Sequence, residues 1–342
     1  MTGHTGFKGA WLSLWLQSLG AEVVGFSDEV ADGPSLFGDA RVGDLVSDER
    51  GDVRDEVLVR QVVRHADPEV VFHLAAQSLV RRSYRQPVET WATNVLGTVN
   101  VLDACRTAPG VRALLVVTSD KCYEEGDGGP HREGDPLGGP DPYSSSKAAA
   151  ELATAAWRSS FLTDDGPAVA SVRAGNVIGG GDWSEDRLVP DAVRAALAGE
   201  VLHLRNPDAV RPWQDVLDCL HAYLLVAERL LVDRSAARAW NVGPTDEACA
   251  TVADVVGRLA GAWPGGFRWE ATPDAAAPRE APRLELDASD AHRLLGWHPS
   301  RTLDESLVAI ADWHVAQAGG ADAQSLSLAQ LEAFCRAAGI AA

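Results

Sequence analysis

The sequence contains very little lysine. Of its 30 lysine and arginine residues only three are lysine, namely Lys8, Lys121 and Lys147. Arginine stays charged and carries a bulky planar fork, so it cannot replace a compact ammonium group or release a proton. We therefore expect the three lysines to be kept for chemistry, and all three fall inside motifs described below.

Long hydrophobic runs and paired cysteines are also missing. No apolar run reaches the roughly 18 residues that a membrane span needs, and the start, MTGHTGFKGAW, lacks the basic and apolar stretches of a secretory signal. The five cysteines are widely spaced without a CxxC pair, which indicates neither a disulfide framework nor a metal site. We expect a cytoplasmic protein with reduced thiols and no metal.

Positive charge is scarce as well. The formal net charge is -19 and the pI is about 4.8. Nucleic acids and anionic membranes are therefore excluded as partners, because their phosphates would be repelled at long range. A small anionic ligand can still bind where arginines or helix N-termini cluster locally.

The first half of the chain alternates short apolar runs with helical patterns. Apolar runs occupy residues 22–27, 69–75, 113–119 and 169–174, and apolar residues recur at three-to-four spacing in residues 10–20, 55–66, 87–105 and 143–160. Strands that alternate with helices indicate βαβ units. We predict an α/β fold with a doubly wound parallel sheet.

After residue 174 the composition changes to loops rich in Gly, Pro and Trp, which is typical of a region that faces a substrate. A helix near residues 216–230 and a strand at 239–243 are expected to return to the sheet. We therefore predict two interleaved domains. Residues 1–172 and 212–243 would form a dinucleotide-binding domain, and residues 173–211 and 244–342 a smaller substrate domain.

Three glycines near the start indicate a dinucleotide site. Gly3, Gly6 and Gly9 in TGHTGFKG precede a predicted helix, and backbone without side chains approaches a pyrophosphate at a helix N-terminus. About 20 residues further on, Ser27 and Asp28 end a strand, where a polar group suits a ribose hydroxyl and disfavours a 2'-phosphate. The motif predicts NAD rather than NADP, bound by Gly3, His4, Thr5, Gly6, Phe7, Lys8 and Ser27.

Other segments are expected to follow the cofactor. Asp52 and Val53 sit where a third strand would end, and Asp52 either reaches the adenine amino group or caps a helix. HLAAQ ends the next strand. In it, Leu74 is followed by two small residues, Ala75 and Ala76, which let the backbone pass close to the ligand. The glycine loop begins at Thr2, although this fold needs an apolar strand before it. We expect the natural chain to start upstream and this first strand to be truncated.

The strongest catalytic signal is the pair Tyr143 and Lys147 in DPYSSSK, one helical turn apart. A free tyrosine, with a pKa of about 10, is a poor base, but a neighbouring ammonium favours the phenolate, which can take a hydroxyl proton as hydride leaves. Ser119, after an apolar strand, would share that hydroxyl. Asp120 and Lys121 either add an acid and a base for elimination of water or form a surface ion pair.

Together, TGHTGFKG, HLAAQ, TSDKCYE and YSSSKAAAEL resemble the extended short-chain dehydrogenase/reductase family, across essentially the whole chain. Within it, LVRRSY, RAGNVIGGGDW and RNPDAVRPWQ are similar in order and spacing to segments of the CDP-glucose 4,6-dehydratases. The resemblance implies a Rossmann-like NAD-binding domain, Asn94 near the cofactor, and a homodimer formed through residues 87–105 and 143–160.

The resemblance also implies the reaction. NAD would take hydride from carbon 4 of CDP-glucose, water would leave, and the hydride would return to carbon 6, giving CDP-4-keto-6-deoxyglucose, a deoxysugar precursor for polysaccharides. By the same resemblance Asp120 would protonate the leaving hydroxyl and Lys121 would remove the carbon 5 proton. An Asp/Lys contact lowers the pKa of the acid and raises that of the base, so burial would have to reverse it. The residues alone leave this pairing open.

The substrate contacts that the resemblance implies are Gln77, Asn176, Arg187, Arg205 and Arg211. The arginine fork suits a pyrophosphate, although each arginine can equally serve only to solvate a loop. Two departures concern recognition of the base or sugar. Asp215 ends RPWQD where the family has histidine, and residues 283–285 lack the aromatic and lysine residues expected near LELD.

Other functions stay open at this stage. A nucleotide-sugar 4-epimerase shares the oxidation step but has no elimination, and a dehydratase acting on another NDP-hexose shares the whole chemistry. A non-catalytic NAD-binding protein is suggested by the missing strand, but the complete set of Ser119, Tyr143 and Lys147 argues against it. The choice of CDP over dTDP or UDP depends on the resemblance alone.

Overall fold

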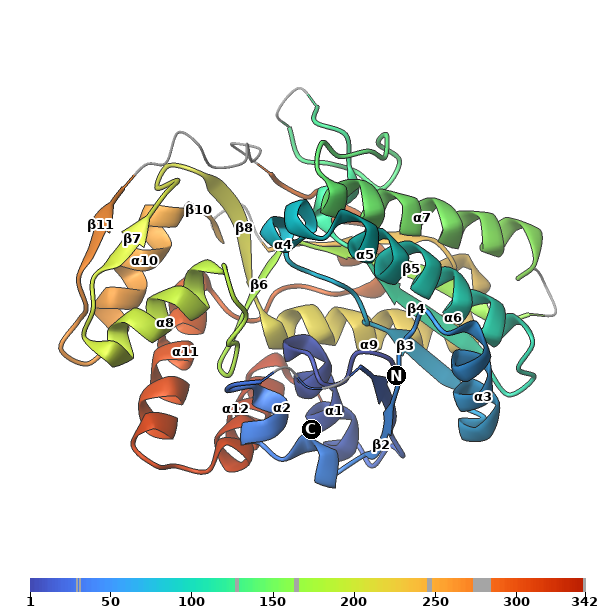
Figure 1. Cartoon of the computed structure of the whole chain (residues 1–342), viewed down its shortest axis with the longest axis horizontal. Coiled ribbons are helices and arrows are strands. Elements are labelled where there is room, and N and C mark those ends of the chain that lie inside the picture. The colour runs from blue at the N-terminus through green and yellow to red at the C-terminus, as the bar shows by residue number, and fades with distance from the viewer. Residues whose placement is uncertain are drawn as a thin grey trace.

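The computed structural model describes residues 1–28, 30, 32–126, 129–162, 166–244, 248–272 and 284–340. A parallel sheet runs through the larger part of the molecule (Figure 1). Its hydrogen-bonded order is β3-β4-β5-β9 in one part and β1-β2 in the other. These strands are β1 (Val24–Ser27), β2 (Ser47–Arg50), β3 (Val70–His73), β4 (Ala113–Val117), β5 (Ala168–Ala174) and β9 (Ala239–Val242).

Residue Thr2 joins the two parts of this sheet. It forms parallel bridges to Phe26 of β1 and to His73 of β3. Its amide donates to the carbonyl of Phe72 at 2.9 Å, and its carbonyl accepts from the amide of Leu74 at 3.1 Å. The chain therefore enters the glycine loop from the middle of the sheet, between β1 and β3. The expected strand upstream stays a prediction.

Helices cover both faces of the sheet. One face packs against α1 (Phe7–Ser18) and α9 (Val216–Val232), with α12 (Ala323–Ala338) packed on α1, and the other against α3 (Glu56–Ala66), α6 (Gly97–Arg106) and α7 (Pro142–Ser160). Strand β4 shows why both faces must be covered, because Leu115 lies in the first core and Leu114 in the second. Successive side chains point to opposite faces, so a strand covered on both sides is apolar throughout.

A smaller lobe follows β5. It contains a three-stranded sheet in the order β10-β8-β6 and a two-stranded sheet of β7 and β11, and its own core packs these against helices. Figure 1 shows this lobe beside the main sheet. The elements are β6 (Asn176–Ile178), α8 (Leu188–Ala198), β7 (Leu202–Leu204), β8 (Val210–Asp215), β10 (Cys249–Thr251), α10 (Val252–Ala262), β11 (Trp269–Ala271) and α11 (Leu303–Ala318).

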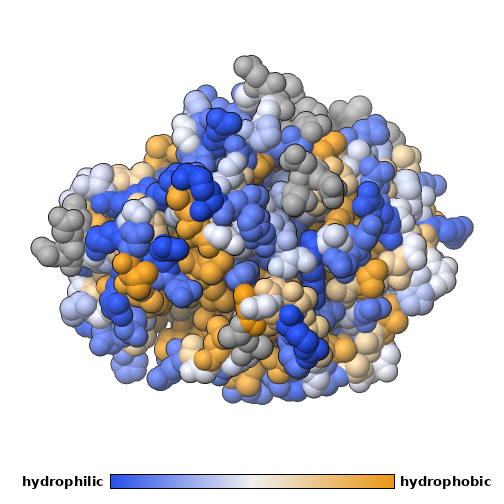
Figure 2. Space-filling model, turned by 180° about the vertical axis from the view of Figure 1, so that it is seen from behind, coloured by the Kyte–Doolittle hydropathy of each residue, from blue (hydrophilic) through white to orange (hydrophobic). Residues whose placement is uncertain are grey.

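Short elements complete the described chain. They are α2 (Leu36–Asp39), η1 (Val42–Asp44), α4 (Val80–Arg85), α5 (Pro87–Trp91), the π-helical η2 (Ala92–Leu96), η3 (Asp120–Cys122), η4 (Arg234–Ala236) and the π-helical η6 (Ala291–Leu295). No helix in the described parts is long and apolar enough to span a membrane. On the side opposite to Figure 1, hydrophilic residues cover most of the surface and hydrophobic ones gather around a hollow (Figure 2).

The predicted α/β fold is confirmed, and most element boundaries lie close to the predicted ones. The helix expected at residues 87–105 consists of α5, η2 and α6 in succession, because the middle turn is π-helical. Strand β2 corresponds to the third strand of the prediction, and it ends at Arg50 rather than at residues 52–53. The interleaved domain boundaries stay a prediction, and β8 spans the one placed at residue 212.

Candidate active site

A cavity of about 320 Å³ lies where the carboxyl ends of β4 and β5 face the smaller lobe. In an open α/β sheet this edge is where ligands bind. All three lysines of the chain line it, together with Ser119 and Tyr143. The three lysines come from three separate elements of the chain and meet in one cavity. This supports the expectation that the rare lysines are kept for chemistry.

The glycine loop makes room for a ligand at the start of α1. Gly3 has a φ of +74°, and a Cβ atom there would lie 2.6 Å from the backbone nitrogen of Ala75. No side chain caps α1 at Gly6, which leaves the helix N-terminus to a ligand. Nearby, the hydroxyl groups of Thr5 and Ser27 are 2.7 Å apart at the end of β1. This cradle fits the pyrophosphate and ribose of a dinucleotide.

Two other predicted cofactor residues are engaged within the protein. His4 is fully buried, and its Nε2 lies 2.7 Å from Oδ1 of Asp48, while burial lowers its pKa. Asp52 accepts hydrogen bonds from the amide and from Nε of Arg54 at 2.8 and 2.7 Å. The alternative that Asp52 caps α3 is wrong, because Asp55 is the N-cap. Val53 is buried, next to the backbone of Gly97.

Some residues of the HLAAQ segment line the cavity, and others hold the loop in place. Leu74 and Ala76 line the cavity. The side chain of Gln77 turns back onto its own loop, where it accepts from the amide of Leu79 at 2.6 Å. Asn94 clamps the same loop by accepting from the amide of Gln77 at 2.8 Å and donating to its carbonyl at 3.0 Å. Gln77 and Asn94 thus shape the loop and are not among the residues that line the cavity.

Helix α7 carries Tyr143 and Lys147 into the cavity. The side chain of Asp141 caps it by accepting from the amides of Tyr143 and Ser144, both at 2.9 Å. Burial raises the pKa of Tyr143 to about 12, and the neighbouring Ser119 hydroxyl acts in the opposite direction. Burial, assisted by the positive charge of Lys8, lowers the pKa of Lys147 to about 7. The ammonium of Lys147 donates to the carbonyl of Val117 at 3.2 Å, which holds it beside β4.

The acid of the predicted acid/base pair is buried. The Ser119 hydroxyl donates to Oδ1 of Asp120 at 3.0 Å and accepts from the Lys121 amide at 3.2 Å. Asp120 is 2% exposed, and its Oδ2 finds no hydrogen-bond partner within the described residues. Burial raises the pKa of Asp120, and this outweighs the lowering by Lys121. The interpretation as a surface ion pair is therefore wrong.

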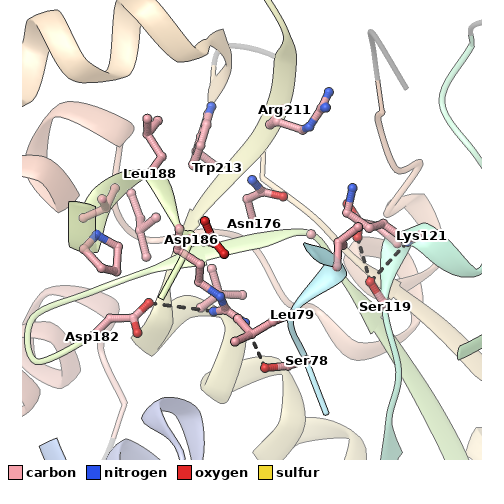
Figure 3. Close-up of a pocket in the computed structure, with 18 of the residues that line it drawn as sticks. Ser78, Leu79, Ser119, Lys121, Asn176, Asp182, Asp186, Leu188, Arg211 and Trp213 are labelled. Carbon is pink, nitrogen blue, oxygen red and sulfur yellow. Dashed lines mark hydrogen bonds and ion pairs between the residues drawn. The ribbon is translucent and has the colours of Figure 1, made fainter. Parts of the chain in front are cut away.

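Arginines and carboxylates form the outer part of the cavity. Nη2 of Arg187 donates to the hydroxyl of Ser78 at 3.2 Å, and its Nη1 lies 3.7 Å from Asp182 (Figure 3). Arg205 lies 3.7 Å from Asp186. Asn176 and Arg211 border the same space as Lys121 (Figure 3). Four of the five predicted substrate residues, Asn176, Arg187, Arg205 and Arg211, therefore line the cavity, and Gln77 does not.

Sequence reasoning missed several residues here. Tyr223 of α9 accepts a hydrogen bond from the ammonium of Lys8 at 2.9 Å, and nothing local in its helix indicates this role. Arg81 of α4 and Asp186 also line the cavity, 3.9 Å apart. Arg81 belongs to the LVRRSY segment, so its motif was a usable signal. Asp186 adopts a left-handed backbone with a φ of +55°.

The departure at Asp215 lies away from the cavity. Its side chain caps α9 by accepting from the amide of Leu217 at 2.8 Å and pairs with Arg301 at 3.0 Å. Neither charged residue lines the cavity. The exchange of histidine for aspartate therefore concerns packing between α9 and the segment before α11. Of the second departure, Arg283 lies outside the described residues.

Known proteins share this architecture. A model of the GDP-mannose 4,6 dehydratase family matches residues 1–309. A CDP-glucose 4,6-dehydratase of Salmonella typhimurium is 45% identical over 329 residues, covering 94% of this chain and 91% of that protein. A dTDP-glucose 4,6-dehydratase of Xanthomonas campestris is 29% identical over 339 residues, covering 92% of each.

A solved structure adds the cofactor of a relative. The Thermus thermophilus UDP-glucose 4-epimerase, in complex with NAD, superposes with a TM-score of 0.77 at 27% identity, covering 92% of this chain and 97% of that one. The match of the family model over most of the chain and the 45% identical relative lead to one conclusion: the chain belongs to the nucleotide-sugar 4,6-dehydratase family that the GDP-mannose 4,6 dehydratase model describes.

Proposed function

We propose that this protein is a CDP-glucose 4,6-dehydratase, a hydro-lyase that converts CDP-glucose to CDP-4-keto-6-deoxyglucose and water. The observation that carries the proposal is the buried Asp120 next to Lys121, in one cavity with Ser119 and Tyr143. Oxidation of a hydroxyl needs only a base such as Tyr143, whereas elimination also needs an acid that keeps its proton. The 45% identical Salmonella relative supports the choice of substrate.

The chain's own residues divide the work between two steps. Tyr143, helped by the charge of Lys147, takes the proton of the carbon 4 hydroxyl, which Ser119 holds. Once carbon 4 is a ketone, the carbon 5 proton becomes acidic, and Lys121 removes it and returns a proton to carbon 5 after water has left and carbon 6 has received hydride. Asp120 gives its proton to the departing hydroxyl on carbon 6, which leaves as water. A buried aspartic acid suits this donation because burial keeps it protonated to a higher pH.

The cofactor in this proposal is NAD, held by the glycine loop and the N-terminus of α1, with Ser27 at its ribose. When bound, it accepts the hydride of carbon 4 and later supplies it to carbon 6, so that none is consumed. The backbone near Gly3 and Ala75 admits no further side chain. This supports a loop whose backbone, free of side chains, contacts the cofactor directly.

The substrate's diphosphate would bind among Arg187, Arg205 and Arg211. In this protein of net charge -19 they gather at the cavity, where their forks suit pairs of phosphate oxygens. Arg187 and Arg205 face carboxylates at 3.7 Å, beyond hydrogen-bond distance, so a phosphate can compete for them. Asn176 would contact the nucleotide sugar deeper in the same cavity.

We also propose a homodimer formed through α5, η2 and α7. These segments pack on one another and expose the apolar side chains of Val88, Trp91, Leu96 and Leu152, which are 43–81% exposed in the single chain. Leu152→Glu should convert a dimer to a monomer in analytical ultracentrifugation. Val57→Glu, at an exposed apolar position on α3, is the matched control and should change nothing.

The function is tested by incubating the protein with NAD and CDP-glucose. A base-sensitive 4-keto chromophore and a mass lower by one water should both appear, and Lys121→Ala or Tyr143→Phe should abolish them. An unchanged mass with an epimerised sugar would assign a 4-epimerase instead. Faster turnover of dTDP-glucose, UDP-glucose or another NDP-hexose would reassign the base or sugar, and NAD binding without turnover would indicate a non-catalytic protein.

A further inference from the structure

A buried ion pair lies close to residues 119–121, which are called the catalytic segment below. Glu151 of α7, one turn after Lys147, pairs with Arg173 of β5 at 2.7 Å, and both side chains are at most 4% exposed. The carboxylate also accepts from the hydroxyl of Thr118 at 2.5 Å and from that of Ser171 at 2.8 Å. Three donors therefore satisfy this carboxylate, as a buried charge requires. Neither Glu151 nor Arg173 lines the cavity.

The same pair reaches the other end of the segment. Nη1 of Arg173 donates to the hydroxyl of Tyr123 at 2.8 Å, and that hydroxyl donates to Oδ1 of Asn241 on β9 at 2.5 Å. The ring of Tyr123 also stacks on His131, with centroids 4.6 Å apart and planes at 2°. Tyr123 is thus held by one side chain from each of two strands and by a stacked ring.

Residues Ser119, Asp120 and Lys121 lie between these two anchors. Thr118 comes immediately before them and Tyr123 shortly after, and both are tied to the Glu151–Arg173 pair. Within the segment, the Ser119 hydroxyl bonds Asp120 and the Lys121 amide. The anchors therefore limit how far the acid and base can move, whereas Tyr143 and Lys147 are fixed separately by helix α7.

We propose that the Glu151–Arg173 pair, acting through Thr118 and Tyr123, positions Asp120 and Lys121 for elimination. Tyr123 is then a positioning residue that touches no reacting atom. The inference rests on the proposed function, because it assigns the two anchored residues to the elimination step. Oxidation at carbon 4 also uses Ser119 but takes its base, Tyr143, from α7, so loss of the Tyr123 anchor should slow elimination more than oxidation.

The test uses variants that spare the ion pair. Tyr123→Phe removes one hydroxyl and leaves Glu151 with its three donors, and Thr118→Val loosens the other anchor. Glu151→Gln is a poor probe because it leaves a buried guanidinium without its counter-charge, and the variant can fail to fold. The matched control is Thr154→Val on α7, the helix of Glu151. It removes a buried hydroxyl whose hydrogen bond within the described structure goes to the carbonyl of Ala150.

Turnover is measured on CDP-glucose carrying deuterium at carbon 4 or at carbon 5. For Tyr123→Phe we expect kcat to fall by about 10- to 100-fold, the size of effect that a small misplacement causes, with KM nearly unchanged. The isotope effect from carbon 5 should grow and that from carbon 4 should not. Thr118→Val should act in the same direction, and Thr154→Val should match the unaltered protein.

A second measurement does not depend on turnover. Hydrogen exchange of residues 118–123 should be faster in Tyr123→Phe than in the unaltered protein, with the melting temperature close to that of Thr154→Val. Unchanged exchange, or a larger carbon 4 isotope effect, would overturn the positioning role. If the unaltered protein does not dehydrate CDP-glucose, the proposed function fails by itself, and the exchange result still decides whether Tyr123 anchors the segment.

Discussion

Replacement of Asp120 by asparagine removes the proposed proton donor and keeps the shape of the side chain. The carboxyl is 2% exposed, and its Oδ2 has no hydrogen-bond partner in the described structure. Its pKa is raised by burial in spite of the charges of Lys121 and Arg211, which lower it. An asparagine amide fills the same space but cannot give up a proton to the leaving hydroxyl.

The size of the effect follows from the role. A positioned general acid contributes about 10²- to 10⁴-fold, which is about 2.7–5.5 kcal/mol of activation free energy. The sign of the pH dependence follows from the direction of the pKa shift. Protonated Asp120 is the active form, so dehydration falls as the pH rises through its raised folded pKa, roughly tenfold per unit beyond it. Asp120→Asn should lose most of the rate and this alkaline fall as well.

The assay follows the 4-keto chromophore and the loss of water across a range of pH. Asp215→Asn serves as the control, because it changes a buried carboxylate outside the cavity and should keep the pH profile while the protein melts earlier. Two results would refute the reasoning. One is an Asp120→Asn variant that dehydrates at the unaltered rate, and the other is one that keeps the same alkaline fall.

Three further changes test other parts of the molecule. Gly3→Ala should weaken NAD binding in calorimetric titration, because φ is +74° and its Cβ would meet backbone at 2.6 Å. Lys8→Met removes a charge that lowers the pKa of Lys147, so the pH at which Lys147 loses the ammonium charge that assists Tyr143 should rise in the rate profile, and no shift would mean that the two charges are not coupled. Arg301→Met strands the buried carboxylate of Asp215 and should lower the free energy of unfolding by about 3–5 kcal/mol in chemical denaturation.

Much of the fold was predictable because its signals are local. The apolar run at residues 113–119 predicts a strand covered on both faces, and β4 is buried at every position. The run at residues 143–160 predicts α7 to within one residue. The π-helical turn at Ala92–Leu96 was not predictable, because one extra residue in a helical turn hardly alters a three-to-four spacing.

The candidate site divides in the same way. Motif spacing was enough to nominate Tyr143, Lys147 and Ser119, since each stands at the end of a strand or on the first turns of a helix. It could not predict the side-chain contacts whose partners are remote in sequence. His4 is engaged by Asp48, and Gln77 turns back because Asn94 holds its loop.

Amino-acid order alone determined the βαβ pattern, the glycine cradle and the identity of the three lysines, because each of these is a property of a short segment. It could not decide in which direction the pKa of Asp120 shifts. Desolvation depends on which atoms exclude water from the carboxyl, and these include the backbone of Gly175, which is remote in sequence. Tertiary packing also joins Lys8 to Tyr223 and Glu151 to Arg173. Electrostatic energies depend on distance and burial in space, which separation along the chain does not specify.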